Sequence, residues 1–329
     1  MKALVTGATG FVGSHLVERL LQADMDVLCL VRQTSDPVWI RDLPVETRVA
    51  ALDQPERIAE AIAEADYVFH VAGLTRARTR RAYFAVNAEG TRRVVSGALA
   101  GGGALRRLVY VSSLAAAGPA PTADPLDEGA AAAPIDAYGA SKLAAERIVL
   151  AAADDLPVTI VRPPAVYGPR DTNFLPLFRT ARRLRLAPLI GRKTHRVSFV
   201  YAADLAEGIY RAATTADAEG QTYFIAGGTH TQDDLADAVS HALGLPLRKV
   251  RIPALLARLA GEYGQLKWLL TGKPQILSRR KIKDALQSRW TCCWDKARRE
   301  LGYRERTDLA SGMKQTAEWY IQQGWLEAP

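Results

Sequence analysis

Cysteine is scarce in this chain, which has only Cys29, Cys292 and Cys293 among its 329 residues. The three show no metal-ligand spacing, and two neighbouring cysteines are unsuited to an ordinary structural disulfide. We therefore expect neither a disulfide framework nor a metal site. A reducing compartment, the cytoplasm, fits this usage best.

Long apolar runs are also missing. No uninterrupted run reaches the length of a membrane-spanning helix, which predicts a protein without integral membrane segments. Met1 is followed at once by Lys2 and the strand-like ALVTG, so we expect no targeting leader ahead of the fold.

Signatures of nucleic-acid binding are absent despite a net charge of +8. The basic residues are spread over ARTRRA, ARRLRL, GRKTHR, SRRKIK and KARRE, a distribution that solvated faces explain. Nucleic-acid binding stays open as an alternative of a different class. A salt-dependent shift of duplex or single-stranded probes would reveal it.

Strand and helix patterns do alternate along the first half of the chain. Buried strands are predicted at KALVTG, DVLCLVR, TRVAAL, DYVFHVAG, RRLVYVSS and VTIVRPP, with helices between them, including GFVGSHLVERLLQAD, PERIAEAIAEA and Asn87 to Ala100. This alternation predicts an α/β fold, a doubly wound parallel sheet of Rossmann type covered by helices on both faces.

The alternation weakens after residue 165. We expect a dinucleotide-binding domain over residues 1–165, to which 196–226 return through a strand, a loop and a helix in HRVSFVYAADLAEGIYRAA. Residues 166–195 and 227–329 would form a smaller, mostly helical substrate-binding domain.

A glycine-rich turn, TGATGFVGSHL, joins the first strand to the first helix. Gly7 would permit the tight turn, Gly10 the approach of a pyrophosphate, and Gly13 close packing of helix on strand. The exposed N–H groups at the start of the helix favour an anion. The turn therefore predicts a dinucleotide site.

Tyr138 and Lys142 stand four residues apart in AYGASKLAAE, so one helix face would carry a phenol and an ammonium. A neighbouring positive charge favours the phenolate and brings the phenol closer to useful acid/base chemistry. Tyr263 and Lys267 repeat the spacing in GEYGQLKW. Only the first pair follows a strand pattern ending in serines, so we assign catalysis to that pair.

These motifs, together with HVAGLT, VNAEGT, RPPAVYGPRD and SFVYAADLA, make the chain resemble the extended short-chain dehydrogenase/reductase superfamily over nearly its whole length. The resemblance implies that Tyr138 exchanges a proton with the substrate oxygen and that Lys142 lowers its pKa and holds the nicotinamide ribose. Ser113 would hydrogen-bond the substrate oxygen, with Ser112 as the alternative. The cofactor contacts it implies come from Gly7, Thr9, Gly10, Phe11, Val12, Gly13, Arg32, Leu52, Val71, Ala72, Gly73, Leu74, Asn87, Tyr138, Lys142 and Pro164.

Two positions depart from the pattern of the NAD-binding members of this superfamily. At the end of the second strand these members carry an acidic residue, whereas this chain has Arg32, which can clamp a phosphate but accepts no hydrogen bond. This favours NADP over NAD, although the nearby Asp36 keeps NAD open. Ala51 replaces an adenine-contacting Asp; Asp53 could reach the adenine instead, or cap the helix ahead of Pro55.

The expected substrate follows from a further comparison with the superfamily. Pro164, Ala165 and Val166 stand where many sugar-nucleotide enzymes have a sugar-binding Asn, and Leu114, Ala115 and Ala116 replace the dehydratase Asp-Glu pair. An apolar rim suits a hydrophobic substrate, and RPPAVYGP resembles hydroxysteroid dehydrogenases and dihydroflavonol reductases. We predict interconversion of a secondary alcohol and a ketone on a steroid-like or polyketide-like molecule.

A sugar-nucleotide epimerase that keeps NAD tightly bound is the alternative, since it would use the same three residues. A regulatory protein without catalysis is disfavoured, because all three are present. The residues determine neither the exact substrate nor the direction of reaction.

Two segments are each open to two interpretations. Arg76 and Arg78 in ARTRRA would be solvated, or would meet a phosphate or an acidic substrate. The basic, Leu-rich residues 248–273 would pack on the substrate domain, or rest on a membrane surface or cover the substrate. The resemblance also implies a homodimer, paired through a four-helix interface that includes the Tyr138 helix.

Overall fold

A parallel sheet of seven strands organises the N-terminal part of the computed structural model, which describes residues 1–101, 105–190, 195–271 and 279–327. The order is β10-β6-β5-β4-β1-β2-β3, and every pairing is parallel. The strands are β1 (Lys2–Thr6), β2 (Asp26–Val31), β3 (Glu46–Val49), β4 (Tyr67–His70), β5 (Arg107–Val111), β6 (Val158–Arg162) and β10 (Thr222–Phe224). The predicted α/β fold with a doubly wound parallel sheet is confirmed.

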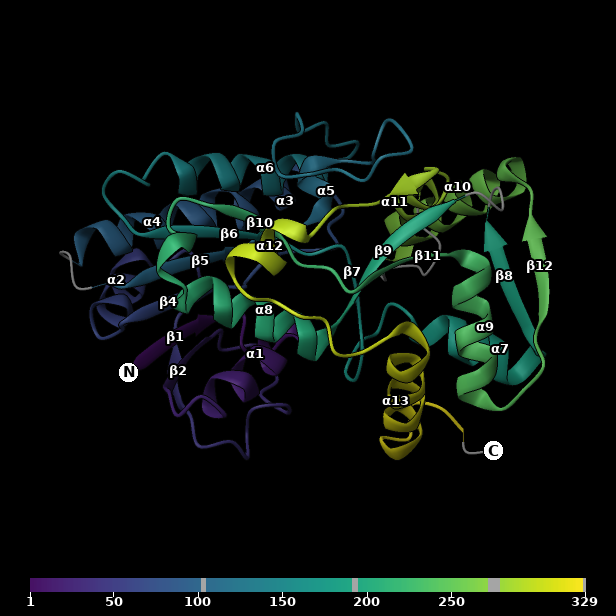
Figure 1. The fold of residues 1–329 in the computed structure, drawn as a ribbon, viewed down its shortest axis with the longest axis horizontal. Coiled ribbons are helices and arrows are strands. Elements are labelled where there is room, and N and C mark those ends of the chain that lie inside the picture. The colour runs from purple at the N-terminus through teal and green to yellow at the C-terminus, as the bar shows by residue number, and fades with distance from the viewer. Residues whose placement is uncertain (102–104, 191–194, 272–278, 328–329) are drawn as a thin grey trace.

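Helices cover both faces of this sheet, as Figure 1 shows. One face carries α1 (Phe11–Leu21) and α8 (Ala202–Thr214), which pack against each other; the other carries α2 (Pro55–Ala63), α3 (Arg80–Asn87), α4 (Glu89–Ala100) and α6 (Ala137–Leu150). Because both faces are covered, the central strands are mostly apolar rather than alternating; β5, for example, is buried at every position, including Arg107.

The strand register brings the loops of the site together. Thr6 at the end of β1 pairs with Leu30 of β2 and with His70 of β4, so the loops that follow these strands begin side by side. The short helix α5 (Leu114–Ala117) begins just after β5 at the same edge. In a doubly wound sheet this carboxyl edge is where ligands bind.

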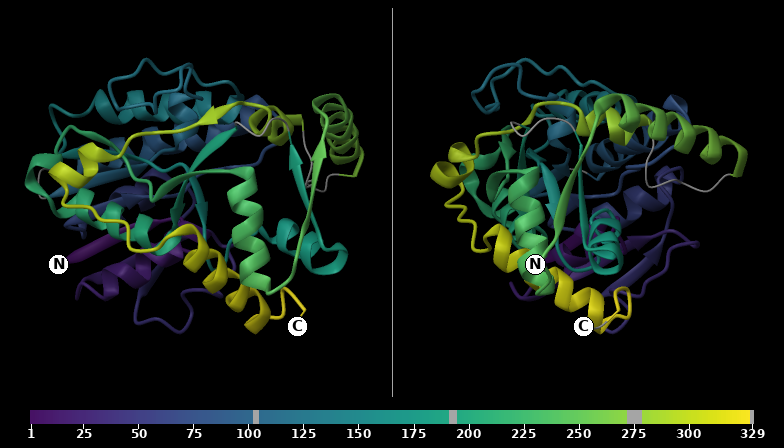
Figure 2. Two further views of the ribbon diagram at one scale, coloured as in Figure 1. Left: turned by 45° about the vertical axis from the view of Figure 1, so that its right-hand side comes forward. Right: turned by 90° about the vertical axis from the view of Figure 1, so that its right-hand side faces the viewer.

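The C-terminal part contains two small sheets besides its helices. A four-stranded sheet joins β7 (Ala165–Tyr167), β9 (Arg196–Tyr201), β11 (Gly228–Thr231) and β13 (Arg289–Trp290), and β8 (Leu186–Ile190) pairs with β12 (Arg248–Ile252). The helices are α7 (Leu175–Leu184), α9 (Gln232–Leu243), α10 (Ala254–Thr271), α11 (Arg279–Ala285), α12 (Asp295–Glu300) and α13 (Leu309–Gln322), with a 3-10 turn, η1, at Ala216–Ala218. Both views of Figure 2 show α10 at the outer edge of the molecule.

Several local expectations need correction. The helix expected from Asn87 begins at Glu89, and a separate helix, α3, precedes it with Thr79 as its N-cap, which accepts a hydrogen bond from Ala82 N at 3.2 Å. No loop separates β9 from α8, since Tyr201 is both the last strand residue and the N-cap. Residues 202–226 return to the large sheet through α8 and β10, whereas β9 belongs to the four-stranded sheet.

Candidate active site

The glycine turn between β1 and α1 is built as the sequence indicates. Gly7 has φ +74°, a left-handed conformation that suits glycine, and a Cβ at Gly13 would lie 2.1 Å from the carbonyl oxygen of Gly7. A Cβ at Gly10 would come no closer than 3.2 Å to that oxygen. Gly7 and Gly13 are thus required by the turn and its packing, while a Cβ at Gly10 would make one tight contact and otherwise face open space.

A cleft of about 440 Å³ opens over this turn at the carboxyl edge of the sheet. No acidic residue occupies the first turn of α1, so its N-terminal N–H groups remain suited to a phosphate. Twelve of the predicted cofactor residues line the cleft: Gly7, Thr9, Gly10, Phe11, Val12, Gly13, Arg32, Leu52, Val71, Ala72, Gly73 and Leu74.

The far end of the cleft is formed by the loops after β2 and β3. Arg32 and Ser35 line it, and Ser35 Oγ accepts a hydrogen bond from the Arg32 backbone N–H at 3.2 Å. Asp36 is outside the lining and meets Arg41, with 3.8 Å between its Oδ1 and the guanidinium. Ala51 and Asp53 are outside it too, and the N-cap of α2 is Gln54, so the expected capping role of Asp53 is wrong.

A buried hydrogen-bond chain supports the floor of the cleft. Thr6 Oγ1 and His70 Nδ1 are 2.7 Å apart, His70 Nε2 and Thr91 Oγ1 are 3.0 Å apart, and Thr91 Oγ1 donates to the Asn87 carbonyl at 2.6 Å. Because the Thr91 hydrogen is used there, His70 donates from Nε2 and accepts from Thr6 at Nδ1. Burial lowers the pKa of His70 to about 3, so this network is neutral.

Asn87 holds the loop that closes one side of the cleft. Its Oδ1 accepts from Leu74 N at 2.7 Å, and its Nδ2 donates to the Leu74 carbonyl at 3.1 Å and to Ser141 Oγ at 2.9 Å. Asn87 is buried and does not line the cleft. It fixes Leu74, a lining residue, relative to α6.

The predicted catalytic side chains come from the start of α5 and the first two turns of α6, and two of them, Ser113 and Tyr138, are neighbours. Ser113 is the N-cap of α5, and its hydroxyl hydrogen-bonds the Tyr138 phenol. Lys142, one turn further along α6, donates from Nζ to the Val111 carbonyl at 2.7 Å. A Cβ at Gly73 would lie 3.6 Å from this Nζ, so Lys142 lies directly behind the wall of the cleft.

Asp136 explains why α6 starts where it does. It is the N-cap, and its Oδ1 accepts from Gly139 N at 2.7 Å. A Cβ at Gly139 would come within 2.1 Å of the Ala115 carbonyl oxygen, so α5 and α6 are in very close contact. This contact keeps Ser113 beside Tyr138.

Burial governs the pKa values of both titrating residues. It raises the pKa of Tyr138, opposed by the charge of Arg280 and by the hydrogen bond from Ser113. It lowers the pKa of Lys142 to about 7, opposed by the charge of Glu146. Glu146 is itself buried and takes two hydrogen bonds from Arg162, at 2.9 Å from Nε and 2.7 Å from the terminal nitrogen.

Ser112, the alternative to Ser113, has a different environment. Its hydroxyl is buried and has no hydrogen-bond partner among the described residues. The structure brings Ser113, and not Ser112, to the phenol.

The second Tyr-Lys pair lies on α10. A strand, β12, does precede this helix, so the expectation that only the first pair follows a strand is wrong. Tyr263 is nevertheless 68% exposed, and it lines neither the cleft nor the pocket beside Tyr138.

That pocket, of about 400 Å³, opens beside Tyr138 and adjoins the cleft, because Thr75 and Asn173 line both. Aromatic side chains of Tyr83 and Trp268 line it together with Arg76, Arg78, Arg80, Arg280, Asp136 and Asp284. The rim is therefore mixed, unlike the apolar rim expected from the sequence. Pro164, Ala165 and Val166, which carried that expectation, line neither cavity.

Arg280 was not identified from the sequence. It reaches from α11 to Asp136 and the Thr75 carbonyl, donates to Tyr83 Oη at 3.1 Å, and lies 4.4 Å from the ring centre of Tyr138. Asp171, Thr172 and Asn173 of the cleft were also missed as contacts, although Asp171 ends the quoted RPPAVYGPRD. The motif predicted that this loop lies near the site, but it did not predict which of its side chains line the cleft.

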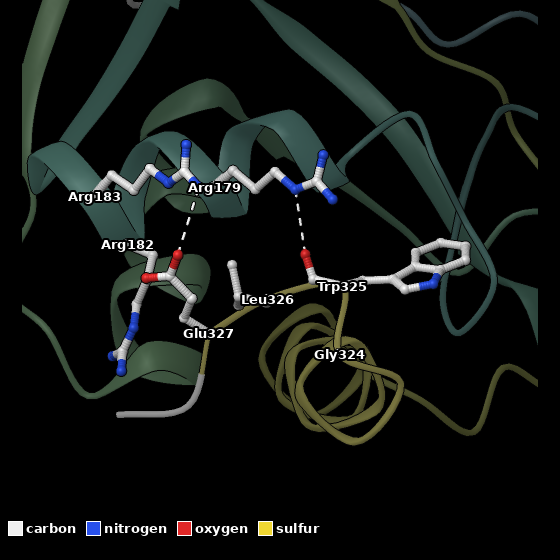
Figure 3. Close-up of a pocket in the computed structure, with 7 residues that line it drawn as sticks. All are labelled: Arg179, Arg182, Arg183, Gly324, Trp325, Leu326 and Glu327. Atoms are coloured by element: carbon white, nitrogen blue, oxygen red, sulfur yellow. Dashed lines mark hydrogen bonds and ion pairs between the residues drawn. The ribbon is translucent and has the colours of Figure 1, made fainter.

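A separate hollow lies between α7 and the end of α13 (Figure 3). Arg179 Nε donates to the Trp325 carbonyl at 3.2 Å, and Arg183 meets Glu327 at 3.4 Å. It shares no lining residue with the cleft or the Tyr138 pocket. These contacts fasten the C-terminal segment to α7.

Comparison with known proteins identifies the family. The model of the NAD dependent epimerase/dehydratase family matches residues 3–226, which include the cleft, Ser113, Tyr138 and Lys142. The chain belongs to this family. It is thus an enzyme of the extended short-chain dehydrogenase/reductase type, which uses a nicotinamide cofactor.

Its relatives include two named reductases. The chain is 33% identical to a ceramide reductase of Caulobacter vibrioides, over 98% of this chain and 95% of that protein. It is 29% identical to a 4-hydroxy-2-methyl-3-oxo-4-farnesyl-3,4-dihydroquinoline-1-oxide ketoreductase of Stigmatella aurantiaca, over 95% of each chain.

Solved structures share the fold over the full length of this family member. The crystal structure of gox2253 superposes with a TM-score of 0.83 and 28% identity, covering 99% of both chains. A UDP-glucuronic acid 4-epimerase from Bacillus cereus, in complex with UDP-glucuronic acid and NAD, reaches 0.78 at 20% identity, covering 98% of this chain and 100% of that one. The latter likeness speaks for the fold alone.

Proposed function

We propose that this enzyme reduces a ketone to a secondary alcohol on a lipid-like molecule, with NADPH as hydride donor. The observation that carries the proposal is that Ser113 lies next to Tyr138 at a pocket of about 400 Å³ that adjoins the cleft, while Lys142, one turn along α6, lies behind the cleft wall at Gly73.

The residues of the cleft fit a dinucleotide phosphate. The glycine turn leaves backbone N–H groups at the start of α1 for the pyrophosphate, and Arg32 offers a cation for a ribose phosphate. Asp36, which could accept hydrogen bonds from a ribose, is outside the lining and lies near Arg41. NADP is therefore favoured over NAD.

When bound, the nicotinamide supplies a hydride to the carbonyl carbon. Tyr138 then gives its phenolic proton to the carbonyl oxygen, and the hydroxyl of Ser113 stabilises the negative charge that develops there. The charge of Arg280, 4.4 Å from the ring centre of Tyr138, favours the phenolate that remains. Lys142 faces the cleft wall at Gly73, where the family resemblance gives it the nicotinamide ribose. The same steps run backwards during oxidation.

An amphipathic substrate fits the pocket best. Tyr83 and Trp268 provide apolar surface, while Arg76, Arg78 and Arg80 provide positive charge at the rim. The related reductases are named for ceramide and for a farnesylated quinoline oxide, which are largely apolar molecules with a polar part. We infer a substrate with a long apolar portion next to a polar or anionic group.

The experiment is a substrate panel with purified protein, NADPH or NADH, and ketones that differ in chain length and head group. Stoichiometric oxidation of NADPH by long-chain ketones supports the proposal, and Tyr138→Phe should abolish turnover but retain cofactor affinity. Full activity of Tyr138→Phe would refute the assigned mechanism.

The arginine-lined rim also favours a second candidate, a sugar-nucleotide epimerase, because guanidinium groups bind diphosphates well. Such an enzyme would consume no net cofactor and would keep NAD bound through purification. Thermal stabilisation by nucleotide sugars, without any by long-chain ketones, would reverse the ranking.

We further propose a cytoplasmic homodimer. The three cysteines are free thiols, which suits a reducing compartment. The family resemblance supports pairing through α6 and its neighbours. Light scattering after size-exclusion chromatography tests this, and a monomer at micromolar concentration would contradict it.

A further inference from the structure

Helix α10 exposes a continuous apolar face. At about 100° per residue, its exposed large apolar side chains fall within one sector of about 100°. They are between 56% and 79% exposed: Leu255, Leu256, Leu259, Tyr263, Leu266 and Leu270. These are six of the thirteen exposed large hydrophobic residues in the described part of the chain.

The opposite face of α10 is occupied. Ala257, Gly261 and Trp268 are buried, and a Cβ at Gly261 would lie 2.9 Å from Ile282 of α11. Gln265 and Trp268 line the pocket beside Tyr138. The helix is therefore anchored on one side, next to the pocket, and apolar on its outer side.

The net charge of the chain is concentrated in the same region. Residues 248–285 contain ten Lys and Arg but only two acidic residues, Glu262 and Asp284, which gives the segment a charge of +8. This equals the net charge of the whole chain, and the remaining residues balance. Three of the ten pair with aspartates outside the segment: Lys249, Arg251 and Arg280. Basic Arg258 and Lys267 flank the apolar sector, and Glu262 near its edge is paired with Arg279 at 3.1 Å.

We propose that α10 is an interfacial helix that docks this enzyme on the surface of an anionic lipid bilayer. The apolar sector would enter the boundary between headgroups and acyl chains, while the surrounding basic residues meet lipid phosphates. None of the described helices is long and apolar enough to cross a membrane, so the contact lies in the plane of the interface.

Charge favours a bilayer over a second copy of the chain as the occupant. Two copies meeting through α10 would bring Arg258 and Lys267 of both chains together, which repels them, since Glu262 of this helix is already paired with Arg279. An anionic bilayer complements both the apolar sector and the charge.

Docking would place the catalytic pocket at the lipid surface. Its lining residues Gln265 and Trp268 lie on the docked helix, and Arg280 and Asp284 lie on the neighbouring α11. A lipid-like substrate could then reach Tyr138 from the membrane. The docking itself goes beyond the proposed reaction and does not depend on it, since vesicle binding is measured without substrate.

The test is co-sedimentation of the full chain with vesicles of phosphatidylcholine alone or with about a quarter phosphatidylglycerol. We expect binding to the anionic vesicles that weakens with salt. The double variant Leu259→Asp/Leu266→Asp should reduce partitioning at least tenfold. Arg258→Gln/Lys267→Gln should reduce it by about fivefold or more.

Leu184→Asp is the matched control, because Leu184 on α7 is 63% exposed and lies outside the apolar sector; it should bind like the wild type. Unchanged thermal melting of each variant excludes misfolding. Equal binding by the wild type and Leu259→Asp/Leu266→Asp would overturn the proposal. Absence of vesicle binding together with a dimer that the same variant dissociates would also overturn it, in favour of a second copy.

Discussion

The pKa values of Tyr138 and Lys142 are shifted in opposite directions by the same cause, which is burial. Burial favours the neutral form of each group, which raises the pKa of the phenol and lowers that of the ammonium to about 7. The groups that oppose these shifts are specific neighbours: Ser113 and Arg280 for Tyr138, and Glu146 for Lys142. The protonation state of the site is therefore set by a few contacts that substitution can remove one at a time.

Ser113 and Ser112 give a matched pair of substitutions. Ser113→Ala should lower kcat by roughly 10²- to 10³-fold, the usual loss for one donor to a developing oxyanion. Ser112→Ala should have little effect on kcat, because its hydroxyl has no partner among the described residues. Steady-state kinetics with a reducible ketone compares them, and a larger loss for Ser112→Ala would transfer the role to that residue.

Glu146 should control the alkaline limb of activity. Lys142 loses its charge as the pH rises through about 7, so activity that needs the charged form declines above that pH. Glu146→Gln removes the charge that raises this pKa and should shift the limb of kcat/KM to lower pH. The exposed Glu89, paired with Arg92 on α4, provides the control Glu89→Gln. If the alkaline limb of kcat/KM lies at the same pH in Glu146→Gln as in the wild type, Lys142 is not the group that sets this limb.

Arg32 should decide the cofactor preference. Arg32→Asp replaces a phosphate-binding cation with an anion that repels the phosphate and accepts hydrogen bonds from ribose hydroxyls. The ratio of kcat/KM for NADPH to that for NADH should fall by at least about tenfold, as expected for loss of one charged contact. Arg57→Asp, an exposed change on α2 outside the cleft, should leave the ratio unaltered. A constant ratio in Arg32→Asp would contradict NADP selection by this residue.

At the scale of elements, the start of α1 serves two functions. The helix must pack against β1 and the loop after β4, and it must leave its N–H groups open to the cleft. Gly13 is needed for packing, since a Cβ there would lie 2.1 Å from the Gly7 carbonyl oxygen; a Cβ at Gly10 would make one tight contact, 3.2 Å from the same oxygen, and would meet no other atom of the described residues within 4 Å. The packing of α1, which depends on Gly13, can thus be separated from cofactor binding, which depends on Gly10, although both residues lie in one turn.

Alanine at these two glycines should have different effects. Gly13→Ala forces α1 away from β1 and should lower both the melting temperature and the affinity for cofactor. Gly10→Ala should keep the melting temperature within a few degrees of the wild type but weaken cofactor binding, because the methyl group stands where a pyrophosphate approaches. Calorimetry and cofactor titration measure both quantities. Equal loss of stability in the two variants would contradict this division.

At the scale of the whole molecule, sequence patterns predict the features that residues close together in the chain determine, such as strands, turns and helices. Six strands of the large sheet, the glycine turn and the Tyr138 helix follow from periodicity and spacing, and the structure has them in the expected order; the edge strand β10 is not predicted by the sequence pattern. Arg280 could not be predicted, because its contact with Tyr138 joins helices far apart in the sequence and depends on how α11 packs. The mixed rim was predicted only in part: Arg76 and Arg78 line the pocket, in line with one of the two interpretations of ARTRRA, whereas Trp268 reaches it through tertiary packing that the sequence does not indicate.

Long-range contacts also join the two ends of the chain. Trp39 lies 5.4 Å from Trp319 of α13, and the Arg170 guanidinium stacks on Trp39 and pairs with Glu18 of α1. Side chains from the first and last helices thereby meet the loop that carries Asp171 and Asn173 into the cleft. No periodicity in the sequence marks this cluster, since each partner contributes a single aromatic or charged residue.

The central claim is net hydride transfer from the cofactor to a ketone at Tyr138. It is tested most directly by a single turnover with NADPH deuterated at the transferred position of C4 and a long-chain ketone, followed by mass spectrometry of the product. The account predicts one deuterium on the new carbinol carbon and one equivalent of NADP⁺ formed. Turnover of a substrate with the deuterium still on the cofactor and no net NADP⁺ would contradict it.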